Sequence, residues 1–441
     1  MPLAGTSSDW KLAIRALRSR NYRLFFGGQS VSLIGTWMTR IATSWLIYRL
    51  TGSALALGIV SFAGQIPAFV LGPIAGVWVD RWDRRRTLVI TQILSMGQSL
   101  ALAALALPGI ITVPEVLALS LFQGLINAVD MPARQAFLIE MIERRSDLGN
   151  AIALNSSMVN AARLIGPAVA GVVVAALGEG YCFLIDGVSY IGVVASLLLM
   201  SVRPAATVRR PTTAWRDLVD GWQYVSRFRP IRSLLLLMML ISLVGQPYTV
   251  LMPVFASQAL HGNSYTLGFL VAASGVGALA GAVTLAMRRT VVGLGRVVFV
   301  SAMLFGAGLI GFGLSSWLWL SLSLMLVTGF GMMRHMAATN TILQTIVEED
   351  KRGRAMAFYS MAFMGMAPFG SLLAGLLATR IGASNTLVLG GAGCVAGGVW
   401  FAAQLPAIRA IVRPIYVELG ILPELAEGVQ AASAMQTPPQ A

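Results

Sequence analysis

The chain changes abruptly from apolar to charged in the stretch GVWVDRWDRRR, residues 76–86. Long apolar stretches lie on both sides of it. Apolar residues make up 56% of the 441 residues and charged residues only 11%, and the mean hydropathy is +0.76. A water-soluble domain with a polar surface does not have this composition. The chain is therefore expected to be an integral membrane protein.

The apolar stretches have the length of membrane-spanning α-helices, because a bilayer core of about 30 Å requires about 20 apolar residues per helix. A membrane β-barrel would instead show short segments of alternating hydropathy. We predict an all-α protein with twelve spans: Tyr22–Leu50, Ala54–Val79, Thr87–Leu107, Val113–Ala133, Asn150–Leu177, Tyr181–Met200, Ile231–Ser257, Tyr265–Met287, Leu294–Leu314, Trp317–Met336, Ala355–Thr379 and Thr386–Leu405.

Basic residues concentrate in alternate connections between the predicted spans. Because Lys and Arg are enriched in cytoplasmic loops, this pattern places both termini in the cytoplasm of a multi-pass protein of the inner (plasma) membrane. The net charge of +14 reflects this asymmetry. We therefore expect membrane lipid as a partner and no nucleic acid.

A polar, basic and Pro-containing segment divides the spans six and six. We predict an N-terminal six-helix bundle over residues 1–200, which begins with a cytoplasmic amphipathic segment. A cytoplasmic linker with an amphipathic helix follows over 201–230, then a C-terminal six-helix bundle over 231–406. Residues 407–441 are expected to form a partly disordered cytoplasmic tail.

The two predicted halves repeat each other weakly. The pattern Gly-x4-Leu-Gly at residues 52–58 recurs at 262–268, and Gly171 matches Gly375 after a similar interval. Parallel six-helix repeats with a substrate site between them characterise one class of secondary transporters, in which the halves rock about that site.

The stretch at residues 76–86 resembles the loop signature Gly-x-Leu-Ala-Asp-Arg-x-Gly-Arg-Arg of the major facilitator superfamily, with Trp78 in place of Leu and Asp83 in place of Gly. The stretches GTWM at 35–38 and DMPARQAF at 130–137 resemble the branch that includes the bacterial enterobactin exporter and many drug exporters. The resemblance implies the major facilitator fold, two six-helix bundles related by pseudo-two-fold symmetry. It also implies export of a small amphipathic molecule, drug-like or a siderophore, by alternating access with proton antiport, in a monomer without cofactors.

The same resemblance implies a cytoplasmic latch that holds the outward-open state. In the family, the residue equivalent to Asp80 faces the start of span eleven, and the residue equivalent to Arg84 pairs with an acid where this chain has Asp130. The implied latch residues are Gly76, Asp80, Arg81, Arg84, Arg85, Asp130 and Arg134. The corresponding loop of the second half, residues 288–296, contains no acid, so we expect the latch in the N-terminal half alone.

Ionisable residues inside spans are candidates for substrate or proton binding. Arg40 and Asp186 come at similar depths, which predicts an Arg40–Asp186 pair. Arg163 has no obvious acidic partner at its depth and could attract an anionic substrate group or bind carbonyls and water. Proton-coupled relatives commonly have Arg where Ser120 stands here, so the coupling residue must lie elsewhere.

Further polar candidates are Gln123, Asn127, Gln246, His335 and Asn340, and the sequence does not decide whether they contact substrate or join helices. His335 and Asp130 are first interpreted as interface or gate residues. Gly166, Pro167 and Gly171 partly match an antiporter signature, and close helix packing explains them equally well.

Other functional classes lack support in the sequence. There are only two His, no His/Cys/acid set has the spacing of a metal site, and no phosphate-binding Gly-x4-Gly-Lys-Ser/Thr motif occurs. We therefore expect neither an enzyme nor an ATP-driven pump. A non-coupled facilitator, a lipid-type transporter and a receptor built on a transporter scaffold remain alternatives.

Overall fold

The computed structural model describes residues 15–79, 81–201, 214–288 and 290–421, and every regular element in these ranges is helical. A 3-10 helix, η1 (Arg15–Arg18), precedes the long helices. The first group is α2 (Arg20–Thr51), α3 (Ala54–Val79), α4 (Arg84–Ala106), α5 (Val113–Glu140), α6 (Leu148–Leu177) and α7 (Glu179–Leu199). The second is α8 (Ala214–Arg227), α9 (Arg229–Leu240), η3 (Ile241–Gly245), α10 (Tyr248–Gln258), α11 (Ser264–Ala286), α12 (Leu294–Leu314), α13 (Leu318–Ile346), α14 (Glu349–Met364), α15 (Ala367–Ile381) and α16 (Ala383–Glu418).

Ten helical segments within the described ranges are long and apolar enough to cross a membrane, so the chain is a multi-pass membrane protein. Helix α2 covers the predicted span Tyr22–Leu50, and α13 covers nearly all of Trp317–Met336 and continues to Ile346, but neither is among the ten. Basic residues, including Arg40, lower the mean hydropathy of α2, and Arg334 and His335 lower that of α13.

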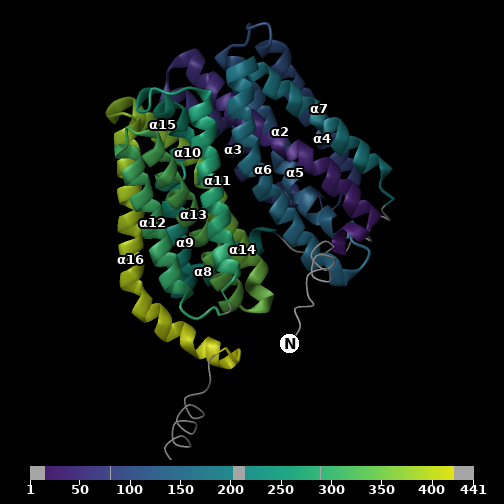
Figure 1. The fold of residues 1–441 in the computed structure, drawn as a ribbon. Helices are drawn as coiled ribbons and strands as arrows, with labels where there is room; N and C mark the ends of the chain where they lie inside the picture. The colour runs from purple at the N-terminus through teal and green to yellow at the C-terminus, as the bar shows by residue number, and fades with distance from the viewer. Residues whose placement is uncertain (1–14, 80, 202–213, 289, 422–441) are drawn as a thin grey trace, which may run out of the picture.

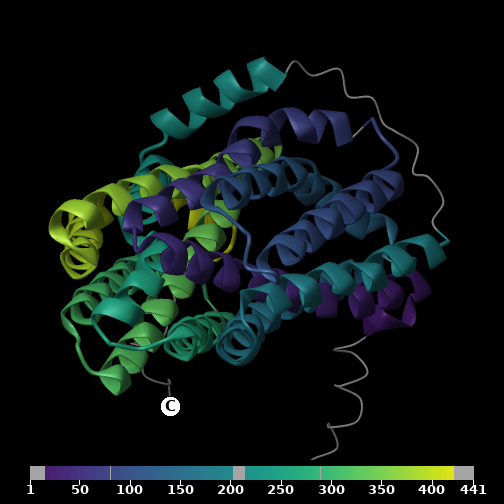
Figure 2. The same ribbon diagram turned by 90° about the horizontal axis from the view of Figure 1, so that it is seen from above.

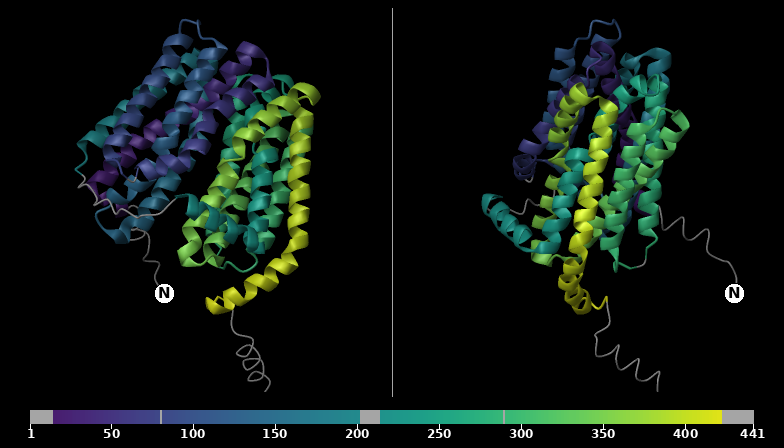
Figure 3. Two further views of the ribbon diagram at one scale, coloured as in Figure 1. Left: turned by 180° about the vertical axis from the view of Figure 1, so that it is seen from behind. Right: turned by 90° about the vertical axis from the view of Figure 1, so that its left-hand side faces the viewer.

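The helices gather in two groups (Figure 1). Helices α2–α7 lie on one side and α9–α16 on the other, and the view from above shows the same division (Figure 2). The groups meet at one end and part toward the end where η1 and the last turns of α16 lie (Figure 3).

Glycines allow the two groups to touch backbone to backbone. A Cβ added at Gly58 of α3 would lie 3.2 Å from Cα of Gly375 in α15, and one added at Gly171 of α6 would lie 3.1 Å from Cα of Gly268 in α11. Small residues, glycine above all, permit such a close approach of two helices. The predicted repeat pairs these same glycines, because Gly58 corresponds to Gly268 and Gly171 to Gly375.

Two of the predicted spans are interrupted helices. Helix α9 continues into the π-helical turn η3, and Pro247 separates η3 from α10. Helix α14 ends at Met364, and α15 starts again with Pro368 in its first turn. Proline lacks the amide hydrogen and clashes with the preceding turn, which explains both breaks.

The segments that were expected to be cytoplasmic agree partly with prediction. Helix α8 forms where the linker was expected to contain an amphipathic helix. Helix α16 continues through Pro406 and Pro414 to Glu418, beyond the expected end of the last span at Leu405. The predicted N-terminal amphipathic segment, most of the linker and the end of the tail fall on residues 1–14, 202–213 and 422–441, outside the described residues.

Candidate functional site

The charged residues of the predicted latch join helices of the first group to one another. Arg84, in the first turn of α4, forms an ion pair with Glu140, the last residue of α5. Asp130 instead pairs with Arg134, one turn further along α5, at 2.6 Å. This conformation therefore does not contain the expected Arg84–Asp130 pair. Helix α5 runs about two turns beyond the predicted end of its span at Ala133 and so brings Glu140 level with Arg84.

The remaining latch residues behave differently from one another. Arg85 donates hydrogen bonds from Nε and Nη2 to the carbonyl oxygens of Leu197 and Leu198, at 2.8 and 2.6 Å. It therefore provides donors for carbonyl groups in the last turn of α7, which have no partner within the helix. Arg81 is exposed, and a Cβ added at Gly76 would meet no described atom within 4 Å. Asp80 lies outside the described residues.

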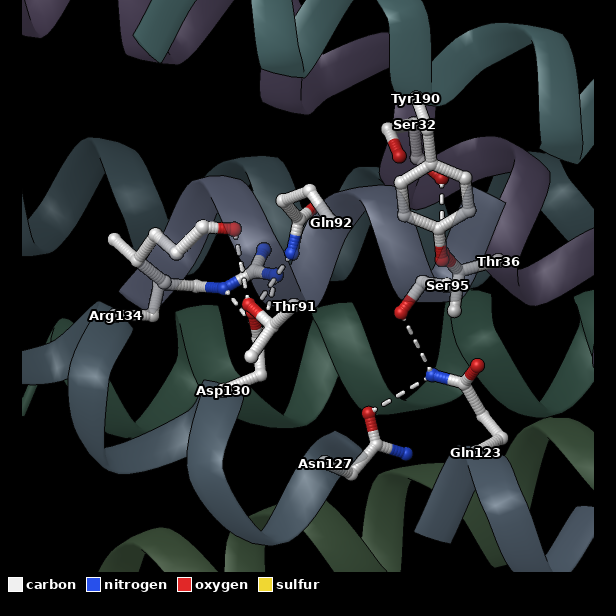
Figure 4. A network of polar contacts seen from close by, with 11 residues as sticks. Ser32, Thr36, Thr91, Gln92, Ser95, Gln123, Asn127, Asp130, Arg134 and Tyr190 are labelled. Carbon is white, nitrogen blue, oxygen red and sulfur yellow. Dashed lines mark hydrogen bonds and ion pairs between the residues drawn. The ribbon is translucent and has the colours of Figure 1, made fainter. Parts of the chain in front are cut away.

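Asp130 is a buried joint between α4 and α5 (Figure 4). Its Oδ1 accepts hydrogen bonds from Thr91 Oγ1 and Gln92 Nε2, both at 2.7 Å, while Oδ2 accepts from Arg134. A buried carboxylate with these donors is held in one position. In this conformation Asp130 therefore joins helices within the first group, and its expected role as an interface or gate residue stays a prediction.

The buried face of α4 is unusually polar for a membrane helix, and sequence analysis overlooked it. Its buried polar residues are Thr87, Thr91, Gln92, Ser95, Gln98 and Ser99. Gln123 Nε2 donates to Ser95 Oγ and to Asn127 Oδ1, both at 3.2 Å (Figure 4). Helical spacing of Thr and Ser at positions 87, 91, 95 and 99 was the available signal.

Asp186 lies near the other end of this polar face. The residue is 2% exposed, and its Oδ2 accepts hydrogen bonds from Thr39 Oγ1 at 2.9 Å and Ser99 Oγ at 2.8 Å. Its Oδ1 is buried without a hydrogen-bond partner. Asp186 thus has only neutral donors among the described residues.

The expected Arg40–Asp186 pair is wrong. Asp186 contacts the face of α2 that carries Thr39, and successive residues of an α-helix point about 100° apart. Arg40 therefore points to a different side of α2, where its guanidinium Cζ lies 4.8 Å from the ring centre of Trp37. Matching depth predicted the level of the two residues but not their direction.

Arg163 of α6 reaches the same tryptophan. Its Cζ lies 5.8 Å from the Trp37 ring centre, so two cations share one aromatic ring. Arg40 is exposed and Arg163 half-buried. Neither has a carboxylate partner or a side-chain hydrogen bond within the described parts of the chain. The sequence did not indicate that Trp37 would bring them together.

The glycines of α6 lie at helix contacts. A Cβ added at Gly166 would lie 2.5 Å from Trp37 Cβ, so this glycine lets α6 approach α2 at the shared ring. Helix α6 continues through Pro167, and Gly171 meets α11.

The polar candidates in the second group of helices do not form one hydrogen-bonded network among the described residues. His335 is fully buried, with Nδ1 3.5 Å from the carbonyl oxygen of Val298. Asn340 accepts a hydrogen bond from Gln344 one turn later. Gln246 lies at the break between η3 and α10, and its Oε1 is buried without a partner.

Residues 12–415 match the model of a major facilitator family described as transmembrane secretion effector. The chain belongs to this family. Similar proteins include the staphyloferrin A transporter of Staphylococcus aureus, 26% identical over 84% of this chain and 92% of that protein. Another is the multidrug efflux pump Tap of Mycolicibacterium fortuitum, 25% identical over 80% of this chain and 88% of the pump.

Solved structures agree on the fold. A POT family transporter in complex with a thioalcohol-conjugated peptide is similar with a TM-score of 0.72 and 12% identity, over 88% of this chain and 96% of the transporter. Membership of the transmembrane secretion effector family makes the chain a transporter rather than an enzyme.

Proposed function

We propose that this transporter exports small amphipathic molecules, drug-like compounds or siderophores, across the inner membrane by alternating access. Its organisation would be twelve spans in two six-helix bundles. Helices α2–α7 supply the first six, and α9–η3–α10, α11, α12, α13, α14–α15 and α16 supply the others. The polar side chains of α2 and α13 are compatible with spanning because such residues face a bundle interior or a water-filled path. The protein would act as a monomer.

The symmetric glycine contacts carry this proposal. Gly58 meets Gly375 and Gly171 meets Gly268, so equivalent positions of the two repeats form equivalent contacts, as a pseudo-two-fold axis requires. Both contacts lie near the ends of α3, α6, α11 and α15 that are remote from η1 and from the last turns of α16. If the termini are cytoplasmic, as the basic residues favour, the outer end is closed and this is an inward-facing arrangement.

The contacts of the latch residues also support an inward-facing arrangement. Arg84, Arg85 and Arg134 bind groups of α5 and α7 within the first bundle. We propose that the link to the second bundle, through Asp80, forms only when the cytoplasmic end closes.

Asp186 is our candidate for the proton carrier in antiport. A carboxylate inside the membrane that lacks a cationic partner is typical of proton relays in transporters. Thr39 and Ser99 bind one of its oxygens, and the other is free to carry a proton. This assignment supplies the coupling group that Ser120 cannot provide.

Transport by purified protein in proteoliposomes tests the proposal. For molecules whose termini face outward, an acidic lumen should drive uptake of a fluorescent amphipathic dye or a siderophore, because protons leave as substrate enters. Asp186→Asn should abolish this stimulation and retain downhill equilibration. Asp130→Asn is the matched control: it removes a buried acid that has a cationic partner and should slow transport without removing the gradient dependence.

Other outcomes identify the alternatives. Equal flux with and without the gradient in the unmodified protein would indicate a facilitator. Absence of flux for every dye and siderophore tested would favour a receptor on a transporter scaffold and contradict export.

A further inference from the structure

We infer that Arg40, Arg163 and Trp37 form the binding site for a carboxylate-bearing, planar organic anion. The inference deepens the proposed export function, because it names the chemical class of a transported molecule. It rests on the convergence of two arginines from different helices on one tryptophan ring.

The local packing builds this site. Trp37 and Arg40 are separated by nearly one turn of α2, and Arg163 stands one turn before Gly166, the residue that receives Trp37. The close approach at Gly166 therefore brings the Arg163 side chain to the same ring as Arg40. The two Cζ atoms lie 5.8 and 4.8 Å from the ring centre.

The site borders the second bundle. A Cβ added at Gly275 of α11 would lie 3.6 Å from the carbonyl oxygen of Arg163. All three site residues lie in the central turns of α2 and α6, far from either helix end. A group bound there would sit near the middle of the membrane and beside the boundary across which the bundles must move.

The charge of the site is uncompensated. Contact with an aromatic face attracts a guanidinium but leaves its positive charge in place. The described salt bridges use other arginines, and Asp186 is turned toward Thr39 and Ser99 instead. Two cations at one aromatic ring repel each other, so an anion that binds near both is favoured by each.

The groups present define the ligand. Guanidinium forks bind carboxylate or phosphate through paired hydrogen bonds. The indole of Trp37 adds an apolar group beside the two guanidinium groups for the body of an amphipathic molecule. Arg40 is exposed although it lies inside a span, and charged residues at that depth face a water-filled path rather than lipid. We assign the site to a carboxylate joined to a planar apolar body.

A matched pair of probes tests this assignment. Binding of 2-naphthoate and of neutral 2-naphthamide is measured on the full chain in phosphatidylcholine nanodiscs. The naphthoate should bind at least tenfold more tightly. Arg40→Gln and Arg163→Gln should each reduce this preference, and the double variant should remove it. Arg334→Gln is the control, because Arg334 contacts the separate ring of Phe330 at 5.4 Å and should leave the preference intact.

The same phosphate-binding chemistry could serve an anionic lipid headgroup. Nanodiscs that contain phosphatidylglycerol distinguish the two sources. Displacement of naphthoate by this lipid, dependent on both arginines, would assign the site to lipid and overturn the inference. An equal preference for naphthoate in the folded double variant would also overturn it.

The result is separable from the export proposal. Export of a neutral or cationic dye with no arginine-dependent naphthoate binding would remove the inference and leave export standing. Arginine-dependent naphthoate binding in a protein that moves no dye, siderophore or naphthoate would retain the site and contradict export.

Discussion

Replacement of Gly268 by Ala should open the end of the molecule at which the bundles touch. The added Cβ would lie 2.8 Å from the carbonyl oxygen of Pro167 and 3.0 Å from Cα of Gly171. Both are backbone atoms, so no side-chain rotation relieves the contact. Helices α6 and α11 would have to separate by about 0.6 Å to restore an ordinary contact, which a close-packed interface resists.

Overpacking of this kind costs about 1–3 kcal/mol. Alanine also favours helix by about 1 kcal/mol over glycine, but this gain is equal in both conformations and does not change their ratio. The population closed at this end should therefore fall by about 5- to 150-fold relative to the open one.

The reporter is Ser371→Cys, which is 3% exposed at the other inter-bundle contact, in a background without Cys182 and Cys394. A membrane-impermeant maleimide should label the cysteine at position 371 at least about fivefold faster when Gly268→Ala is present than when position 268 is glycine. Gly192→Ala is the control, because its added Cβ meets no atom within 4 Å. Equal labelling rates in the two folded variants would refute the reasoning.

Two further substitutions test the polar joints of the first bundle. Arg134→Gln should lower the unfolding free energy by about 3 kcal/mol, near the lower end for a broken buried pair, because Arg134 is partly exposed. Denaturant titration in detergent measures this loss, and a loss below about 1 kcal/mol would contradict the prediction. Arg85→Gln should lower the unfolding free energy by about 1 kcal/mol, because it removes the donors to the carbonyl oxygens of Leu197 and Leu198. Amide hydrogen exchange at the end of α7 should become faster in this variant, and unchanged exchange there would argue against the capping role.

The sequence predicted the helices well because a membrane span has a strong and simple signal. Predicted boundaries such as Ala54–Val79 and Leu294–Leu314 coincide with α3 and α12. The breaks at η3 and between α14 and α15 were missed, since hydropathy is continuous across them. Pro247 and Pro368 were the available signals.

The site was harder to predict, because depth along a helix says nothing about direction around it. Arg40 and Asp186 were assigned to similar depths in the membrane. Asp186 of α7 contacts the side of α2 that carries Thr39, whereas Arg40 points from another side of α2. Glu140 was overlooked because α5 was expected to end near Ala133. The shared contact of Arg40 and Arg163 depends on Gly166, whose partner across the helix interface a single sequence does not reveal.

A reversible crosslink across the bundles tests alternating access most directly. Ser61 Oγ of α3 and Ser371 Oγ of α15 lie 3.2 Å apart, so cysteines at these positions face each other and can form a disulfide. A control pair, Ser315→Cys with Ser321→Cys, lies within the second bundle, where the hydroxyl oxygens are 2.9 Å apart. Oxidation of the inter-bundle pair should stop transport and reduction should restore it, while the control pair should transport in both states. Full transport by the oxidised inter-bundle pair would contradict the account.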